Sequence, residues 1–314
     1  MRIAALAAAA ALAGLLAPAA PAQDVRFDAD PAHSNAARQA KQFARAGRHR
    51  DAARMRALSL VPQARWFNGG TPKEVRRGVD EAVTAATQRQ AVPVLVAYNV
   101  PNRDCSLYSA GGARNARGYR AWVSAFARGI GDRPAVVILE PDALAGLCGS
   151  GRRYHLRGAV DRLARAQTSV YVDAGHSNWL PAGVIARRLR KVHAERAAGF
   201  ALNVSNFRST DEIVAYGTRI SSALGGARFV VDTSRNGRGP WDAPRGREDW
   251  CNPPGRGLGA RPTAATGNPL VAAFLWIKAP GESDGECADG HDPPAGNWWP
   301  RYALGLIRRA SPHL

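Results

Sequence analysis

The chain has 314 residues and a formal net charge of +18, with 43 basic and 25 acidic residues. Its length suffices for one large α/β core. The positive charge admits an anionic partner, but the basic residues are scattered and match no known nucleic-acid-binding module, so we expect no nucleic-acid partner. Beyond the first 22 residues no apolar stretch is long enough to cross a bilayer, which excludes an integral membrane protein.

The first 22 residues have the pattern of a secretory signal peptide. Arg2 supplies the charged start, Ile3–Leu16 is apolar, and Ala20-Pro21-Ala22 has the small-x-small form of a cleavage site. A membrane helix is the alternative interpretation, which the short apolar run and Pro18 disfavour. We therefore expect a secreted, soluble protein in which residues 23–314 form one domain.

The densest basic run, from Arg38 to Arg56, carries alanines and a phenylalanine between its charges. This pattern is typical of a helix with one solvated face, which Ser34 or Asn35 can cap at its start and Gly47 can end. We expect the charge of this run to be solvated.

Six short apolar segments farther along the chain each end in polar residues, and most are separated by stretches long enough for a helix. The expected strands are Val92–Ala97, Val136–Leu139, Val170–Val172, Phe200–Leu202, Phe229–Val231 and Phe274–Ile277. The expected helices are Lys73–Gln90, Tyr119–Gly131, His155–Gln167, Pro181–Ala198 and Asp211–Leu224. This alternation predicts a parallel sheet with crossover helices, and six or more such units favour a barrel over an open sheet. The glycine- and proline-rich stretch 234–269 is expected to form long loops within the same domain.

The second apolar segment leads into the sequence VVILEPDALA, residues 136–145. Pro141 has no N–H for a sheet ladder, so the strand should end before it. Glu140 and Asp142 then follow directly at the carboxyl end of a buried strand, where α/β proteins build their chemistry. We take Asp142 as the candidate general acid of a glycoside hydrolase.

The other strand ends carry similar groups, and tryptophans stand near several of them. The polar candidates are Tyr98, Asp104, Asp142, Asp173, His176, Asn203, Asn206, Asp232, Lys278, Glu282 and Asp284. The tryptophans are Trp66, Trp179, Trp241, Trp250 and Trp276, the last of which we expect in the core. Indole faces and carboxylates at one barrel mouth suit a sugar polymer, and two carboxyl groups suffice to hydrolyse a glycosidic bond. About half of these polar residues are expected to be structural.

The four cysteines predict two disulfides in an exported protein, with three possible connectivities. A zinc site is the alternative, but no CxxC pair is present and the spacings are long. We therefore expect no metal and no other cofactor.

Seven motifs in order resemble glycoside hydrolase family 6, the cellobiohydrolases and endoglucanases that cut β-1,4-glucans with inversion. They are YNVPNRDC (98–105), LEPDALA (139–145), YVDAGHSNWL (171–180), GFALNVSNF (199–207), VVDTSRNG (230–237), DWCNPPGRGLGARP (249–262) and WIKAPGESDG (276–285). The resemblance implies a distorted, TIM-like β/α barrel with fewer than eight regular strands. It also implies an active-site cleft at the carboxyl ends of the strands.

The resemblance also implies catalytic roles. Asp142 stands where the family has its proton donor, and Asp104 stands where a second aspartate keeps that donor protonated. Tyr98 matches a tyrosine that crowds the sugar at the cleavage point and favours a distorted ring. Asp284 matches the proposed base, which activates a water on the opposite face of the ring.

The remaining site residues are implied as contacts with sugar or as supports of the cleft. The sugar-binding positions are Trp66, Trp179, Trp250, Lys278 and Glu282, while His176 and Asn206 line the same cleft. A loop histidine bonded to backbone is an equal alternative for His176, and Asp173 is expected to be a buried carboxylate near the acid. The resemblance pairs Cys105 with Cys148 and Cys251 with Cys287, which would tie the catalytic loops together.

The loops that roof the cleft in chain-end-acting relatives are short here, at 146–154 and 241–250. We therefore expect an open cleft and an endoglucanase that cuts internal bonds of a β-1,4-glucan or of cellooligosaccharides. The alternatives are an exo-acting cellobiohydrolase of the same family and a catalytically silent glucan-binding protein. A monomer is the expected state.

Overall fold

The computed structural model describes residues 25–149, 151–165, 167–287 and 291–310. The expected signal peptide, residues 1–22, lies outside these ranges. Within them, every helix is too short or too polar to cross a bilayer.

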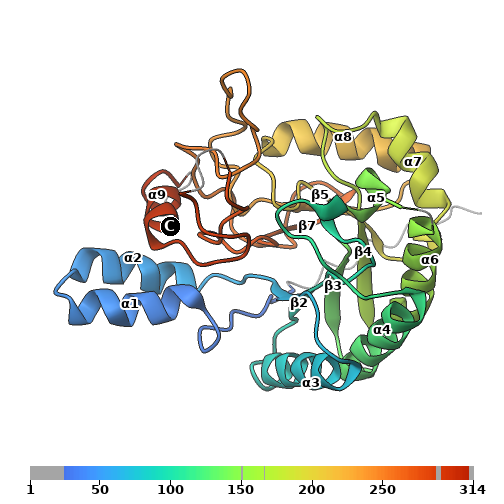
Figure 1. The fold of residues 1–314 in the computed structure, drawn as a ribbon, viewed down its shortest axis with the longest axis horizontal. Helices are drawn as coiled ribbons and strands as arrows, with labels where there is room; N and C mark the ends of the chain where they lie inside the picture. The colour runs from blue at the N-terminus through green and yellow to red at the C-terminus, as the bar shows by residue number, and fades with distance from the viewer. Residues whose placement is uncertain (1–24, 150, 166, 288–290, 311–314) are drawn as a thin grey trace, which may run out of the picture.

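Seven parallel strands form one sheet in which each strand pairs with the next along the chain (Figure 1). The strands are β1 (Arg65–Phe67), β2 (Val94–Ala97), β3 (Ala135–Leu139), β4 (Thr168–Asp173), β5 (Gly199–Leu202), β6 (Phe229–Asp232) and β7 (Val271–Leu275). β2 to β7 are almost entirely buried, which explains why most of them read as continuous apolar runs in the sequence.

The sheet curls, and hydrogen bonds link the chain at its first strand to the chain that follows its last strand. The Ala64 N–H donates to the Trp276 carbonyl at 2.9 Å, and the Trp66 indole Nε1 donates to the Ile277 carbonyl at 2.7 Å. These bonds join the chain around β1 to the chain just after β7. The result is a distorted α/β barrel, as the sequence predicts.

Helices between the strands cover the outside of the barrel, and the first two helices and the last one form a group beside it (Figure 1). The helices are α1 (Asn35–Arg45), α2 (His49–Ser59), α3 (Pro72–Gln88), α4 (Ala116–Ile130), α5 (Ala143–Gly146), α6 (Arg152–Leu163), α7 (Ala182–Arg190), α8 (Thr210–Ala223) and α9 (Pro300–Arg308), with 3₁₀ turns η1 (Asp104–Ser106) and η2 (Ala194–Arg196). Successive residues of a strand point to opposite faces of the sheet, so the strands contribute to two separate cores, one under the helices and one inside the barrel. Leu95 and Val137 pack against the helices, whereas Val96 and Ile138 fill the barrel interior.

The N-terminal helices α1 and α2 form a hairpin that packs with α9, so the first two helices and the last one lie side by side (Figure 1). Ser34 caps α1 by accepting from the Ala37 N–H at 3.4 Å, and Gly47 follows its end with φ +72°. Phe43 and Met55 are buried in the shared core, so only one face of this basic segment is solvated. The second helix of the hairpin was not predicted.

Three sequence expectations need correction. β1 was missed, because its three residues are only half-buried and give no apolar run. The last strand was expected at 274–277 but ends at Leu275, and Trp276 lies just past it in the core, as expected for its side chain. The helix expected at 181–198 is split into α7 and η2, because His193 adopts a left-handed φ of +60° between them.

Candidate active site

A cavity of about 420 Å³ opens at the carboxyl ends of the strands, and it collects most of the predicted site residues. Those that line it are Trp66, Tyr98, Asp104, Asp142, His176, Trp179, Asn206, Trp250, Lys278 and Asp284. Glu282 lines an adjoining cavity that shares Trp66, Tyr98 and Lys278 with this one. Trp241 and Trp276 line neither cavity.

Asp142 is presented to the cavity by an unusual turn after β3. Glu140 and Asp142 both have positive φ, +51° and +66°, a conformation that costs free energy in residues other than glycine. The Asp142 N–H donates to Asp173 Oδ2 at 2.8 Å, which fixes the turn. The buried Asp173 therefore positions Asp142 from behind, in agreement with the expected structural role.

Glu140 holds the other side of this turn. Its buried carboxylate accepts hydrogen bonds from the Asn99 N–H, the Val100 N–H and the Tyr119 hydroxyl, all within 3.0 Å. Burial raises the pKa of Glu140 to about 7, and the hydrogen bonds oppose that rise. Because it ties the end of β3 to the loop after β2 and does not line the cavity, Glu140 is structural.

The surroundings of Asp142 favour its protonated form. Burial is the main cause, and the negative charges of Asp104 and Asp284 add to it, raising the pKa of Asp142 to about 7. The Lys278 ammonium acts in the opposite direction. A carboxyl group with such a pKa can carry a proton near neutral pH and deliver it.

Asp104 lies in η1, where Asp104, Cys105 and Ser106 all have positive φ. Its Oδ2 accepts from the Ser109 N–H at 2.6 Å, which fixes the carboxylate within the loop. Partial burial raises the pKa of Asp104, while this hydrogen bond and Arg103 lower it. Asp104 thus supplies a positioned negative charge near Asp142.

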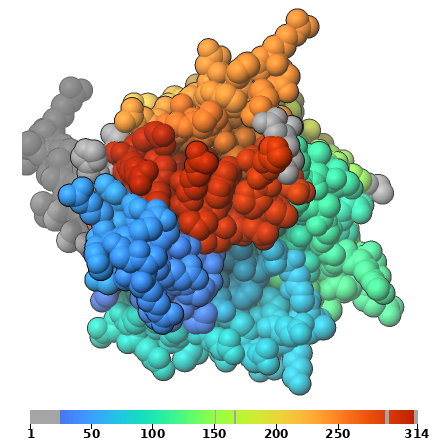
Figure 2. Space-filling view, turned by 60° about the vertical axis from the view of Figure 1, so that its left-hand side comes forward, coloured from blue at the N-terminus to red at the C-terminus, as the bar shows by residue number. Residues whose placement is uncertain are grey.

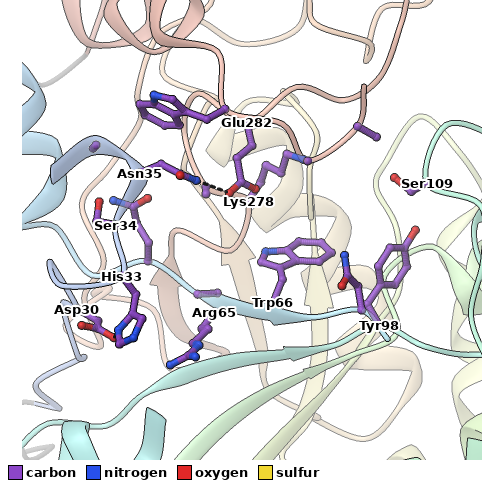
Figure 3. Close-up of a pocket in the computed structure, with 18 of the residues that line it drawn as sticks. Asp30, His33, Ser34, Asn35, Arg65, Trp66, Tyr98, Ser109, Lys278 and Glu282 are labelled. Atoms are coloured by element: carbon purple, nitrogen blue, oxygen red, sulfur yellow. Dashed lines mark hydrogen bonds and ion pairs between the residues drawn. The ribbon is translucent and has the colours of Figure 1, made fainter. Parts of the chain in front are cut away.

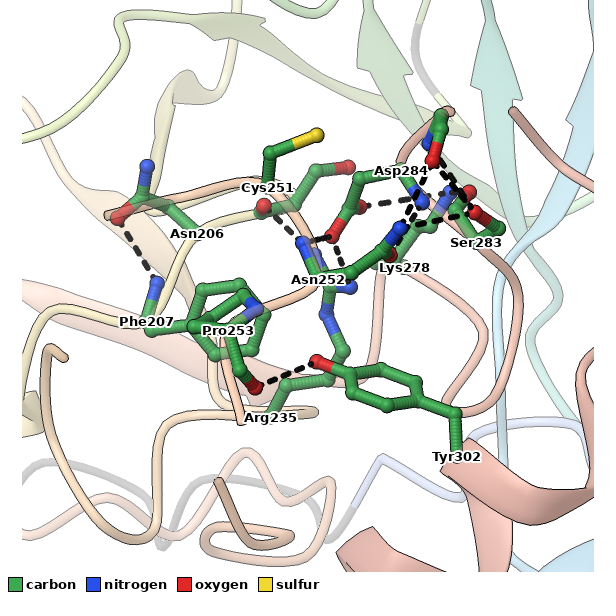
Figure 4. Close-up of polar contacts among 12 residues, drawn as sticks. Asn206, Phe207, Arg235, Cys251, Asn252, Pro253, Lys278, Ser283, Asp284 and Tyr302 are labelled. Carbon is green, nitrogen blue, oxygen red and sulfur yellow. Dashed lines mark hydrogen bonds and ion pairs between the residues drawn. The ribbon is translucent and has the colours of Figure 1, made fainter. Parts of the chain in front are cut away.

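Asp284 is held in a different environment (Figure 4). Its Oδ2 accepts from Arg235 Nη1 at 2.8 Å and from the Asn252 N–H at 3.1 Å, and Lys278 Nζ lies 3.9 Å from Oδ1. The Asp284 N–H in turn donates to Asn252 Oδ1 at 2.8 Å. Two cations therefore balance the charge of this buried carboxylate, whereas Asp142 has carboxylate neighbours.

Arg235 and Asn252 are functional supports that the sequence interpretation missed. The Arg235 side chain is fully buried, and its guanidinium lies 4.3 Å from the centre of the Phe207 ring. It also donates to the Ser205 carbonyl at 2.6 Å. Arg235 stands inside the quoted motif VVDTSRNG, three residues after Asp232, so an arginine close to the end of a predicted buried strand was the available signal.

Tyr98 and Trp66 form one wall of the cleft. Their rings meet edge to face with centroids 5.4 Å apart, and Lys278 Nζ lies 6.0 Å from the Trp66 ring centre. Burial and the charges of the two aspartates at 104 and 142 raise the pKa of Tyr98, so its hydroxyl stays protonated. The wall therefore offers an apolar face beside a hydrogen-bonding group, as a pyranose requires.

The opposite arm of the cleft carries His176, Trp179, Asn206 and Trp250. The His176 ring lies 5.6 Å from the Trp179 ring, and burial lowers the pKa of His176 to about 4, so the imidazole is neutral near pH 7. Its buried Nδ1 has no hydrogen-bond partner among the residues that the structure describes, which does not support the alternative of a histidine bonded to backbone. Trp179 is 39% exposed, which leaves its indole open to a ligand.

Two disulfides brace these loops, with the connectivity that the resemblance implied. Cys105 pairs with Cys148, which joins the loop of Asp104 to the segment after Asp142. Cys251 pairs with Cys287, which joins the Trp250 loop to the Asp284 loop. Each bond thereby limits the motion of two cleft-forming segments relative to each other.

The assembled cavity suits the transfer of a glycosyl group to water. It combines a protonatable carboxyl, a charge-balanced carboxylate and indoles on both arms. Among the described residues, no three His, Cys, Asp or Glu side chains gather as metal ligands.

Comparison with known proteins gives the same family as the motifs. The family model for glycosyl hydrolases family 6 matches residues 22–310. The chain is 44% identical over 247 residues to Endoglucanase A of Thermobispora bispora, an alignment that covers 73% of this chain and 52% of the relative, so the chain spans about half of that protein. It is 41% identical over 295 residues to Endoglucanase 1 of Streptomyces halstedii, covering 90% of this chain and 88% of that one.

A solved structure agrees with this fold. It is the endoglucanase Cel6 from Mycobacterium tuberculosis in complex with methyl-cellobiosyl-4-deoxy-4-thio-β-D-cellobioside, with a TM-score of 0.85 and 43% identity. The alignment covers 91% of this chain and 97% of that chain. By its motifs, its fold and the family model, this chain belongs to glycosyl hydrolases family 6.

Proposed function

We propose that this chain is an endoglucanase that hydrolyses internal β-1,4-glucosidic bonds with inversion. The observation that carries this proposal is the contrast between two carboxyl groups in one cavity. Asp142 has a pKa raised to about 7, while Asp284 is paired with Arg235 and Lys278. Environments that differ in this way assign an acid and a base.

In the proposed reaction the protonated Asp142 gives its proton to the leaving glycosidic oxygen. Asp284 accepts a proton from a water, directly or through a second water, as that water attacks the anomeric carbon from the opposite face. Tyr98 crowds the sugar at the cleavage point and favours a ring distorted toward the oxocarbenium-like transition state. Asp104 keeps the acid protonated through its negative charge.

The preference for internal bonds rests on the open cleft. The segment 147–151 between α5 and α6 is short, and part of the orange loop between β6 and β7 projects away from the barrel (Figure 1), although Trp250 in the same loop lines the cavity. The relatives named above are endoglucanases, and the solved one binds a thio-linked cellooligosaccharide, which supports the same substrate class. An exo-acting cellobiohydrolase and a silent glucan-binding protein are the alternatives.

We also propose that the enzyme is secreted and acts as a monomer, with residues 23–314 as a single catalytic domain. The two disulfides support an oxidising compartment.

The proposal is tested by following hydrolysis of a soluble cellooligosaccharide with proton NMR of the anomeric signals. Inversion predicts that the α-anomer appears first. An initial β-anomer would instead indicate a covalent nucleophile and remove the role of Asp284 as base. Viscometry of a soluble cellulose derivative completes the test, because internal cutting lowers viscosity steeply for each reducing end formed. Release of cellobiose alone with little change in viscosity would identify an exo-acting enzyme.

Asp104→Asn is expected to move the alkaline limb of the pH profile of kcat/KM to lower pH. Asp142 must be protonated to act, so activity falls as pH rises through its pKa. Removing the Asp104 charge leaves the effect of burial but takes away one of the repulsions that raise that pKa, so the limb shifts toward acid. A limb that stays in place in this variant would show that Asp104 does not act on the acid through its charge.

A further inference from the structure

The adjoining cavity, of about 500 Å³, lies next to the catalytic cavity and has no assigned role beyond Glu282. The two cavities share Trp66, Tyr98, Ser109 and Lys278, so they form one continuous cleft. The adjoining cavity is bordered by the start of α1 on one side and by the segment 295–298 on the other. Figure 2 shows the blue N-terminal hairpin lying directly against the red C-terminal segment on this side of the molecule.

The lining of this extension is polar and carries an indole. Asn35 Nδ2 lies 3.4 Å from Glu282 Oε1, a long contact that leaves both groups able to bond a ligand hydroxyl (Figure 3). The Trp298 indole lines the same cavity and packs over Gly281, next to Glu282. Burial raises the pKa of Glu282, while the charges of Lys278 and Arg235 and the hydrogen bond from Asn35 lower it.

A chain that is cut internally must continue on both sides of the cleavage point. On this side, a glucan that passes Trp66 and Lys278 reaches Glu282 and then has an open cavity before it. A cleft that ended in a wall at Glu282 would instead accept only a chain end.

We infer that the cleft holds a further glucosyl unit beyond the Lys278 and Glu282 positions, between Asn35 of α1 and Trp298. The N-terminal hairpin is then part of the substrate-binding surface as well as a packing partner of α9. This inference rests on the proposed glucanase function and extends it to one additional subsite.

The test uses cellopentaose with an ¹⁸O label at its reducing end. Either of two binding positions, called frames here, gives a disaccharide and a trisaccharide. In one frame two glucosyl units lie on the Glu282 side of the cleavage point, and in the other frame three do. The label shows which product carries the original reducing end and so distinguishes the frames. The ratio of frames reports the additional subsite independently of the overall rate.

Two variants probe the subsite in different ways. Asn35→Ala removes a hydrogen-bonding group, and Ala295→Trp fills the cavity with bulk. In each, the frame with three units on this side is expected to fall about two- to tenfold relative to the other, the worth of about one hydrogen bond. Gln42→Ala, an exposed position on the same helix, is the matched control and should keep the wild-type ratio.

The outcomes distinguish a failure of the proposed function from a failure of the additional subsite. If the wild-type enzyme cleaves no β-1,4-glucan, the proposed function fails. If it cleaves cellopentaose and both folded variants keep the wild-type frame ratio, the subsite is absent and the function stands. An equal loss in both frames for Asn35→Ala would mean that Asn35 only positions Glu282, which would also overturn the inference.

Discussion

Replacing Asp142 by Asn is expected to lower kcat on a soluble β-1,4-glucan by about 10²–10⁴-fold, the usual worth of a general acid. The amide keeps the shape of the side chain and its place after β3, but it has no acidic proton to give to the leaving oxygen. Binding of a cellooligosaccharide, measured by calorimetry, should remain close to that of the wild type, because the indoles and Lys278 are untouched.

Asp132→Asn makes the same chemical change at an exposed loop position, and it is expected to leave kcat unaltered. If Asp142→Asn retained most of its activity, another group would have to protonate the leaving oxygen. If the wild type itself bound glucan and turned over none, the silent-binder alternative would be correct.

The second large effect concerns stability. Arg235→Met is expected to lower the free energy of unfolding by about 3–5 kcal/mol, because it leaves the buried Asp284 carboxylate without its main counter-charge. Lys278 lies 3.9 Å from the other carboxylate oxygen and compensates only in part. Urea denaturation followed by circular dichroism gives the difference, and activity should fall with it because Asp284 loses its anchor.

A double-mutant cycle makes this prediction specific to the pair. Arg235→Met combined with Asp284→Asn should cost less than the sum of the single changes, since no unpaired buried charge remains. Arg238→Met removes an exposed arginine a few residues away and should change stability by no more than about 0.5 kcal/mol. Additive losses in the cycle would mean that the ion pair does not couple the two residues.

The barrel was predictable from sequence because its strands are buried on both faces. Segments such as 94–97 and 135–139 therefore read as apolar runs, and the polar residues after them mark the catalytic edge. β1 gave no such signal, because its three half-buried residues begin with a charged arginine and form no apolar run in a hydrophobicity pattern. The α2 helix was hidden for a related reason, since arginines cover one face of it.

The sequence predicted which residues form the site better than it predicted how they are arranged. The residue types and the motifs predicted which side chains line the cleft. No sequence pattern reveals that Asp142 adopts a positive φ, or that its N–H is bonded to Asp173. Arg235 was passed over because a single arginine in a basic chain carries little information until its partner is known. The cysteine pairing likewise required the resemblance, because spacing alone allows three connectivities.

The contact between the chain at β1 and the chain just after β7 also makes the cleft depend on segments far apart in the sequence. Trp66 belongs to the first strand made, yet its indole donor bonds the Ile277 carbonyl, which is synthesised about two hundred residues later. The hairpin of α1 and α2 likewise waits for α9 to cover its apolar face. A chain truncated before β7 would thus contain Trp66 and Tyr98 of the sugar-binding wall but not Lys278 beside them. The cleft is therefore complete only when the segment after β7 and the α9 region have folded against β1 and the N-terminal hairpin.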